Sequence, residues 1–149
     1  MAVIITLVLG TLGARLVGWL NVDYVDSWPR AVAVGLAAMF MMTGIAHFVP
    51  SMRRDMIAIV PPRLPAPGTL VTITGVLELV GAAGLLYPPT RVAAAGCLFA
   101  LMLVMFPANI YASRMPNPPK SMTARLDVRT VEEVVFLAAA VVVGVGSIQ

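Results

Sequence analysis

The chain has 149 residues, of which 60% are hydrophobic and only 11% are charged, and it carries a formal net charge of +3. A single soluble core of this length does not need such an apolar balance, so the composition predicts a polytopic membrane protein rather than a soluble domain. The basic residues lie between apolar segments and form no patch with exposed aromatics, which argues against a nucleic-acid partner. The single cysteine, Cys97, excludes an internal disulfide and dithiol chemistry.

Five apolar runs are each close to the roughly 20 residues that a helix needs to cross a bilayer. They cover residues 1–20, 31–49, 70–87, 92–111 and 130–148, and prolines punctuate the stretches between them. The first run has no basic residues at its start, so we predict a retained helix and not a cleaved signal peptide. We therefore expect one all-α domain over residues 1–149, a polytopic transmembrane helical bundle with five spans.

The second and fourth loops contain most of the basic residues, namely Arg53, Arg54, Arg63, Arg114, Lys120, Arg125 and Arg129. In a five-span chain both loops lie on one side, and basic loops favour the cytoplasm. The sequence thus predicts a cytoplasmic amino terminus and an external carboxyl terminus. Residues 50–68 mix apolar, basic and proline residues, which predicts a short amphipathic turn and then an extended segment along the membrane surface. Thr130 and Glu133 have the spacing of a capping box for the last helix.

A carboxylate, Glu78, interrupts the apolar run "TGVLELVGAAGLL" of residues 74–86. A charged acidic residue at the centre of a membrane helix costs roughly 2.5 to 3.5 kcal/mol, so Glu78 should be partnered or protonated. Helical spacing places Thr74, Glu78 and Gly81 on one face. This face, which is rich in small residues, is predicted to point at other helices and not at lipid.

Two further polar residues are expected near the cytoplasmic ends of neighbouring helices. His47, the only histidine, lies one helical turn after Thr43, and Asn109 follows Pro107, which leaves a backbone carbonyl without its donor. These side chains should converge with Glu78 in the cytoplasmic half of the bundle. Because Glu78 lies deepest, its direct contact with His47 or Asn109 requires helix tilt, bending or an intervening water.

Two interpretations of this cluster stay open at the level of sequence. The side chains could be structural, with a neutral Glu78 hydrogen-bonded across helices, an interaction worth about 0.6 kcal/mol on average. They could instead form a proton-accepting site or the polar end of a pocket for a quinone or other lipid-soluble molecule. One histidine, one cysteine and scattered carboxylates do not supply the ligands of a zinc or di-iron site, so no metal is expected. No catalytic motif is recognised.

Residues 31–112 resemble the DoxX-like family of small bacterial integral membrane proteins. The resemblance is carried by the stretches "MFMMTGIAHFVP", "GVLELVGAAG" and "MFPANIYA" in this order. The resemblance implies a four-helix core over residues 31–148, preceded by an additional helix at residues 1–20, in the bacterial cytoplasmic membrane. It also implies similarity to subunits of a thiosulfate:quinone oxidoreductase, to members of membrane redox complexes and to assembly or cargo factors. Many members have Lys at the position of His47, and this sequence offers no thiol pair, so oxidoreductase activity is not transferred.

The sequence leads to one hypothesis and one alternative. The first is an integral membrane accessory subunit or assembly factor, not an enzyme by itself, whose polar pocket of Glu78, His47, Asn109, Thr43 and Thr74 holds a lipid-soluble ligand. The alternative is a quinone-reactive subunit of a membrane oxidoreductase in which Glu78 and His47 exchange protons. The expected partners are the lipid bilayer, a membrane redox complex or other membrane protein, and a second copy of the chain. The sequence leaves the cofactor unknown, and a quinone is the candidate that the alternative implies.

Overall fold

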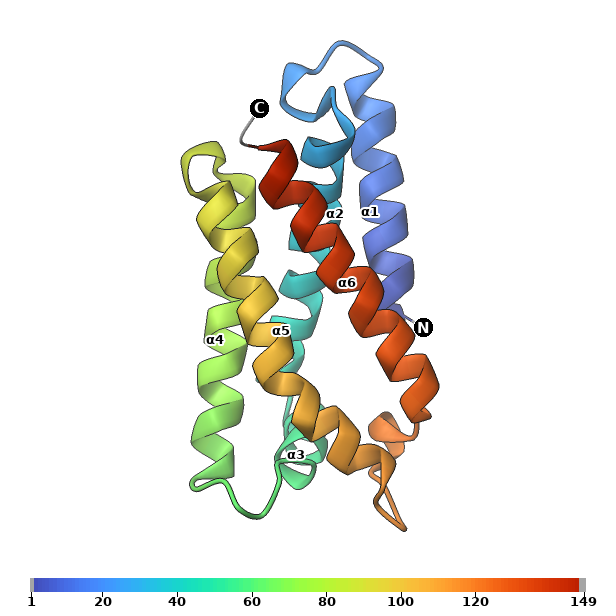
Figure 1. Cartoon of the computed structure of the whole chain (residues 1–149), viewed down its shortest axis with the longest axis vertical. Coiled ribbons are helices and arrows are strands. Elements are labelled where there is room, and N and C mark those ends of the chain that lie inside the picture. The colour runs from blue at the N-terminus through green and yellow to red at the C-terminus, as the bar shows by residue number, and fades with distance from the viewer. Residues whose placement is uncertain (1, 148–149) are drawn as a thin grey trace.

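The computed structural model describes residues 2–147, and in this part of the chain every regular element is helical (Figure 1). Six α-helices and three short 3₁₀ turns follow one another without a strand in this range. The α-helices are α1 (Ala2–Gly18), α2 (Trp28–Ala46), α3 (Pro50–Ala58), α4 (Pro67–Leu86), α5 (Arg91–Ser113) and α6 (Leu126–Gly146). The turns are η1 (Asp23–Val25), η2 (Pro88–Thr90) and η3 (Lys120–Met122). The predicted all-α helical bundle is confirmed.

The five longer helices coincide with the five predicted apolar runs to within a few residues at each end. Met1 of the first run and Ile148 of the last lie outside the described residues. Three of the helical segments are long and apolar enough to cross a membrane: α2, α4 and Pro88–Ser113, which contains α5. The 17 residues of α1 form a shorter apolar helix. The first two turns of α6 carry four charged residues, Asp127, Arg129, Glu132 and Glu133.

The predicted capping box is wrong, because α6 begins at Leu126, one turn before Thr130. Arg125 is the cap residue and adopts an extended backbone without a capping hydrogen bond from its side chain. The hydroxyl of Thr130 donates to the carbonyl of Leu126 within the helix, at 2.8 Å. Glu133 therefore lies well inside α6, and its side chain is available to the interior of the bundle.

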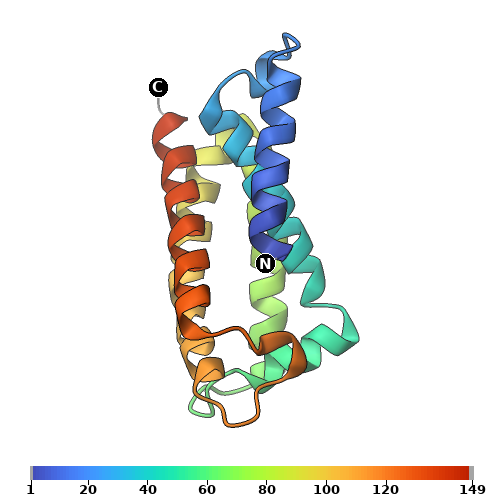
Figure 2. The same cartoon turned by 90° about the vertical axis from the view of Figure 1, so that its right-hand side faces the viewer.

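Two layers of helices make up the molecule, as Figure 2 shows. One layer contains α1, α2 and α4, and the other contains α5 and α6. Helix α2 contacts α1, α4 and α6, so it is the central element. The short α3, which is the predicted amphipathic turn, lies at the lower end together with η3. The amino-terminal end of α1 lies at mid-height, so α1 covers only the upper half of the bundle (Figures 1 and 2).

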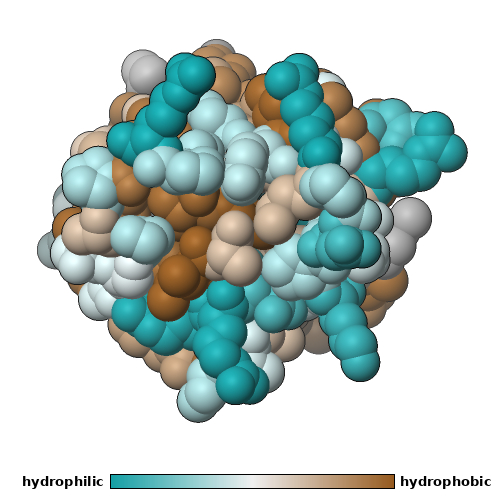
Figure 3. All heavy atoms as spheres, turned by 90° about the horizontal axis from the view of Figure 1, so that it is seen from below, coloured by the Kyte–Doolittle hydropathy of each residue, from teal (hydrophilic) through white to brown (hydrophobic). Residues whose placement is uncertain are grey.

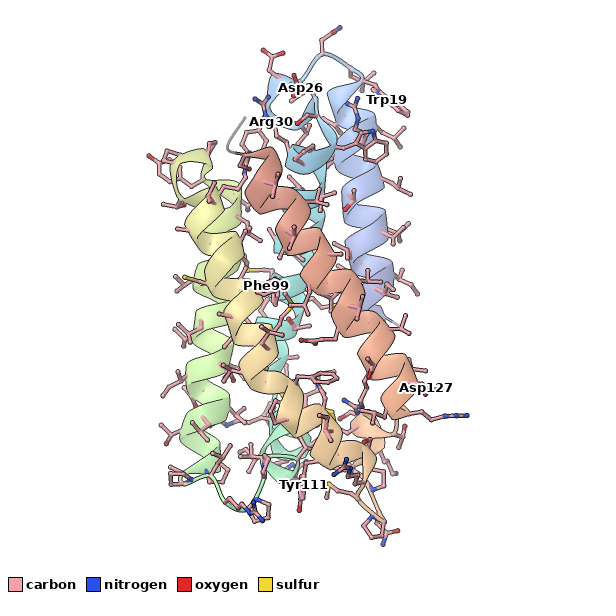
Figure 4. All side chains as sticks on the ribbon, in the orientation of Figure 1. Trp19, Asp26, Arg30, Phe99, Tyr111 and Asp127 are labelled. Carbon is pink, nitrogen blue, oxygen red and sulfur yellow. The ribbon has the colours of Figure 1, made fainter. Side chains whose placement is uncertain are left out.

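The upper half is closely packed, because small residues let the helices approach each other. A Cβ atom added to Gly35 on α2 would lie 2.6 Å from the carbonyl oxygen of Leu7 on α1, so only glycine fits at this crossing. Five large side chains that are almost completely buried fill the space between the helices. They are Leu36, Met39, Leu85, Leu98 and Val143. The side chains of Trp19, Asp26 and Arg30 mark the upper end, and those of Tyr111 and Asp127 lie toward the lower end (Figure 4).

Candidate ligand-binding cavity

A cavity of about 390 Å³ lies in the lower half, bordered by α2, α4, α5 and α6. This volume falls within the range of about 300 to 1,000 Å³ that is typical of pockets for small molecules. Most of the wall is apolar and is formed by side chains such as Met39, Phe40, Leu70, Met102, Met105 and Phe136. Residues of α3 and of the segment that follows it also line the cavity. Seen from below, the lower end has hydrophobic side chains at its middle and hydrophilic side chains toward its rim (Figure 3).

Glu78 lies at the polar end of this cavity and is only 4% exposed. The hydroxyl of Thr43 on α2 donates a hydrogen bond to Oε2 of Glu78 on α4, with a distance of 2.6 Å. Oε1 of Glu78 lies 3.9 Å from Nε2 of His47, which is too far for a direct hydrogen bond. The prediction that Glu78 points at protein is confirmed, and its direct partner is Thr43.

Two glycines bring α2 and α4 close enough for these contacts. A Cβ atom at Gly75 on α4 would lie 2.6 Å from Cβ of His47, so the histidine packs directly on the backbone of α4. A Cβ atom at Gly44 on α2 would lie 2.8 Å from a methyl carbon of Leu79. The sequence thus places Glu78 one turn from the glycine that receives His47, and the crossing of the two helices forms the polar end of the cavity.

The hydrogen bonding of His47 fixes which ring nitrogen carries a proton. Nδ1 lies 2.8 Å from the carbonyl oxygen of Thr43, which can only accept a hydrogen bond, so Nδ1 is the donor. In the neutral imidazole, Nε2 then bears a lone pair and faces Glu78. Behind the histidine, Arg53 donates to the carbonyl oxygens of His47 and Gly68 and to the hydroxyl of Thr72, which joins α3 to α4.

Thr74 and Asn109, the two remaining residues of the predicted pocket, line the same cavity but are not hydrogen-bonded to Glu78. The hydroxyl of Thr74 donates to the carbonyl oxygens of Leu70 and Val71 in its own helix. Oδ1 of Asn109 accepts a hydrogen bond of 2.7 Å from Arg129 of α6. The five predicted residues therefore border one cavity. Four of them belong to two polar groups, Thr43–Glu78–His47 and Asn109 with Arg129, and Thr74 bonds only within α4.

A family model described as "Domain of unknown function (DUF8561)" matches residues 36–144. The chain belongs to this family. No curated protein and no solved structure matches the chain. The DUF8561 region extends from the middle of α2 to the last turn of α6, so it contains both polar groups of the cavity, and α1 precedes it.

Sequence reasoning missed the three charged side chains of α6 that line the cavity, Arg129, Glu132 and Glu133. Arg129, Glu133 and Phe136 are spaced four and then three residues apart, which puts them on one helical face. This signal was overlooked because the helix was expected to begin at Thr130, which assigned Arg129 to a loop and Glu133 to a cap. Within the described chain, Oε1 of Glu133 is buried and has no hydrogen-bond partner.

The cavity combines an apolar interior with groups that exchange protons and accept hydrogen bonds. Glu78 and His47 can both bind or release a proton, and the apolar walls can hold a hydrocarbon body next to them. Among residues 2–147, no three side chains of His, Cys, Asp or Glu are grouped so that they could hold a metal ion. The arrangement is therefore an apolar cavity of about 390 Å³ with ionisable side chains at its border.

Proposed function

We propose that the protein binds a lipid-soluble molecule with a polar headgroup inside the membrane, and that it acts there as an accessory subunit or assembly factor. One observation carries this proposal: a carboxyl group that is 4% exposed borders an apolar cavity of about 390 Å³. Structural hydrogen bonds alone need no such space beside them. Ionisable groups inside a membrane protein commonly mark a functional site, and the site here is large enough to receive a ligand.

We further propose five spans in the bacterial cytoplasmic membrane, with α1 added to a four-helix core of the DoxX-like kind. The loops that contain α3 and η3 lie at the same end, and Ser121 donates a hydrogen bond to Asp55 across them at 2.6 Å. Both loops are rich in Arg and Lys, which favours a cytoplasmic lower end, a cytoplasmic amino terminus and an external carboxyl terminus. Asp26, Arg30 and Trp19 then lie at the external interface (Figure 4).

A second candidate function is that of a quinone-reactive subunit of a membrane oxidoreductase. The observation that favours it is the 3.9 Å separation between Nε2 of His47 and Oε1 of Glu78, two groups that can exchange protons. A quinone carbonyl oxygen that faces both atoms would take up one proton at each one-electron reduction step, from Glu78 in its neutral form or from His47 in its imidazolium form. In this version Glu78 and His47 supply the protons, and a partner protein supplies the electrons.

The decisive experiment is to identify what accompanies the protein from its native membrane. The tagged full chain is purified in a mild detergent, and the bound small molecules and proteins are identified by mass spectrometry. We expect a lipid-soluble molecule at about one per chain, together with a reproducible membrane-protein partner. Recovery of a stoichiometric quinone would favour the quinone-reactive subunit.

A matched variant connects the recovered molecule to the cavity. In Met102→Trp, a larger side chain occupies space in the cavity, and the bound molecule should be lost while the helical content stays unchanged. The control Leu103→Trp lies next to it on α5 but points outward, with 50% of its surface exposed, and should keep the molecule. Protein that carries neither a small molecule nor a partner would contradict the proposal.

A further inference from the structure

The polar end of the cavity presents hydrogen-bond acceptors to whatever occupies it. Nδ1 of His47 donates a hydrogen bond to the carbonyl oxygen of Thr43, so the neutral ring has its lone pair on Nε2. Oε1 of an ionised Glu78 is a second acceptor, 3.9 Å away. Glu133 of α6 also lines the cavity, and its Oε1 is buried without a hydrogen-bond partner within the described chain.

The charges that line the cavity are mainly negative. Among the described residues, three carboxylates and one guanidinium border it, those of Glu78, Glu132, Glu133 and Arg129. Their formal charge is −2 when the carboxyls are ionised and His47 is neutral. Glu132 and Arg129 attract each other, which leaves the charges of Glu78 and Glu133 to be balanced by other means.

Arg129, which lines the cavity, and Arg53, which donates to the carbonyl oxygen of His47, make their hydrogen bonds to groups other than Glu78 and Glu133. Arg129 donates to Oδ1 of Asn109 and to the carbonyl oxygens of Met122 and Ala124, at 2.7 to 3.0 Å. Arg53, which lies behind His47, donates to two carbonyl oxygens and one hydroxyl. Neither guanidinium is hydrogen-bonded to Glu78 or Glu133.

We infer that the ligand of this cavity is an amphiphilic organic ammonium ion, a primary or secondary amine on an apolar body, whose N–H groups bind between Glu78 and His47. This inference names the ligand class of the function proposed above and rests on it. A nitrogen about 2.8 Å from each acceptor bridges the 3.9 Å gap with an angle of roughly 90°, close to what two N–H bonds of an ammonium ion provide.

An ammonium ion suits this site better than a quinone or an alcohol does. A quinone carbonyl only accepts hydrogen bonds, and an alcohol has one proton for two facing acceptors. An ammonium ion donates hydrogen bonds to both acceptors, and its positive charge also balances the negative charge of the carboxylates. The methionines Met39, Met102 and Met105 on the cavity wall can accommodate a flexible hydrocarbon body.

The test compares four ligands with the same ten-carbon tail. Full-length protein in phosphatidylcholine nanodiscs is titrated with decylamine, decyltrimethylammonium, decanol and decylubiquinone, and binding is measured by equilibrium dialysis against empty discs. Decylamine should bind saturably at one per chain and at least tenfold more tightly than decyltrimethylammonium, which has the charge but no N–H donor. Glu78→Gln should lose at least tenfold in affinity for decylamine, whereas Glu78→Asp, which keeps the carboxylate, should retain the preference for it.

Variants on α6 test the contribution of the second carboxylate. Glu133→Gln should weaken decylamine binding several-fold, and Asp127→Asn, the same charge change on an exposed residue outside the cavity, should leave it unchanged. Circular dichroism and gel filtration establish that each variant is folded, and Glu133→Gln still tests the inference if Glu78 variants do not fold. Binding of decylubiquinone without decylamine would overturn the inference and leave the ligand-binding function standing. Binding of none of the four would overturn both.

Discussion

Above Glu78 the bundle is filled with aliphatic side chains, whereas below it α2, α4, α5 and α6 surround a cavity with polar groups. The upper half also has a hollow, a groove of about 280 Å³ between α1, α2 and α6, but Thr11 supplies its only polar side chain among the described residues. The lining of this groove is therefore almost entirely apolar, whereas the lower cavity is lined by ionisable and hydrogen-bonding side chains as well. The comparison teaches that the two halves differ in construction, since close helix packing fills the upper half and the lower half leaves space beside ionisable side chains.

Gly35→Ala should have the largest effect on stability, because it acts on the packed half. The new Cβ atom would meet Oγ1 of Thr11 at 2.1 Å and two backbone atoms of α1 below 3 Å, so α1 must move away from α2. Overpacking against backbone should cost upward of about 3 kcal/mol, at the high end for such changes. The loss is measured by unfolding in mixed detergent and SDS. Gly13→Ala, with open space around it, is the control and should be neutral or raise stability by about 0.5 to 1 kcal/mol.

Truncation of one side chain in each half compares the two directly. Leu36→Ala removes a fully buried side chain from the upper core and should cost roughly 2 kcal/mol or more, because a new empty space remains. Met105→Ala only enlarges a cavity that already exists and should cost less than about 1 kcal/mol. The same unfolding assay measures both values. Equal losses would show that the lower half is as tightly packed as the upper half.

Thr43→Val removes the hydrogen bond between α2 and Glu78 while keeping the shape of the side chain. The free energy of unfolding should fall by about 1 kcal/mol, because a buried carboxyl loses its partner. Thr74→Val is the matched control on the same cavity, since its hydroxyl bonds only to carbonyl oxygens of its own helix. A similar loss in both variants would mean that the contact between Thr43 and Glu78 is not specific.

Ser121→Ala should have the smallest effect on overall stability. Ser121 donates from its hydroxyl and its backbone N–H to Asp55 of α3, and both residues lie at the surface, so the loss should stay below about 0.5 kcal/mol. Local opening should increase, which hydrogen exchange of the α3 amides would detect. The control is Ser113→Ala, whose hydroxyl bonds only within α5. Unchanged exchange in α3 would show that this contact does not hold the lower end closed.

The sequence allowed much of the cavity to be predicted, and the errors have one cause. Glu78 and His47 were predictable because a membrane helix rarely carries an ionisable side chain without a protein partner. Asn109 was placed in the correct half, but its partner Arg129 was missed because the start of α6 was put at Thr130. No local pattern predicts the pairing of Asn109 with Arg129, because the two residues are 20 positions apart in the chain.

The sequence by itself determined the helical class, the five apolar segments and the polar residues that must be shielded from lipid, since these follow from composition and from a repeat of 3.6 residues. Only the tertiary structure decided that Thr43 and not Asn109 binds Glu78, and that Glu133 from the last helix faces the same space. The physical reason is that side-chain partners across helices depend on where helices cross. Those crossings are set by close contacts such as Gly75 against His47, which no local pattern encodes.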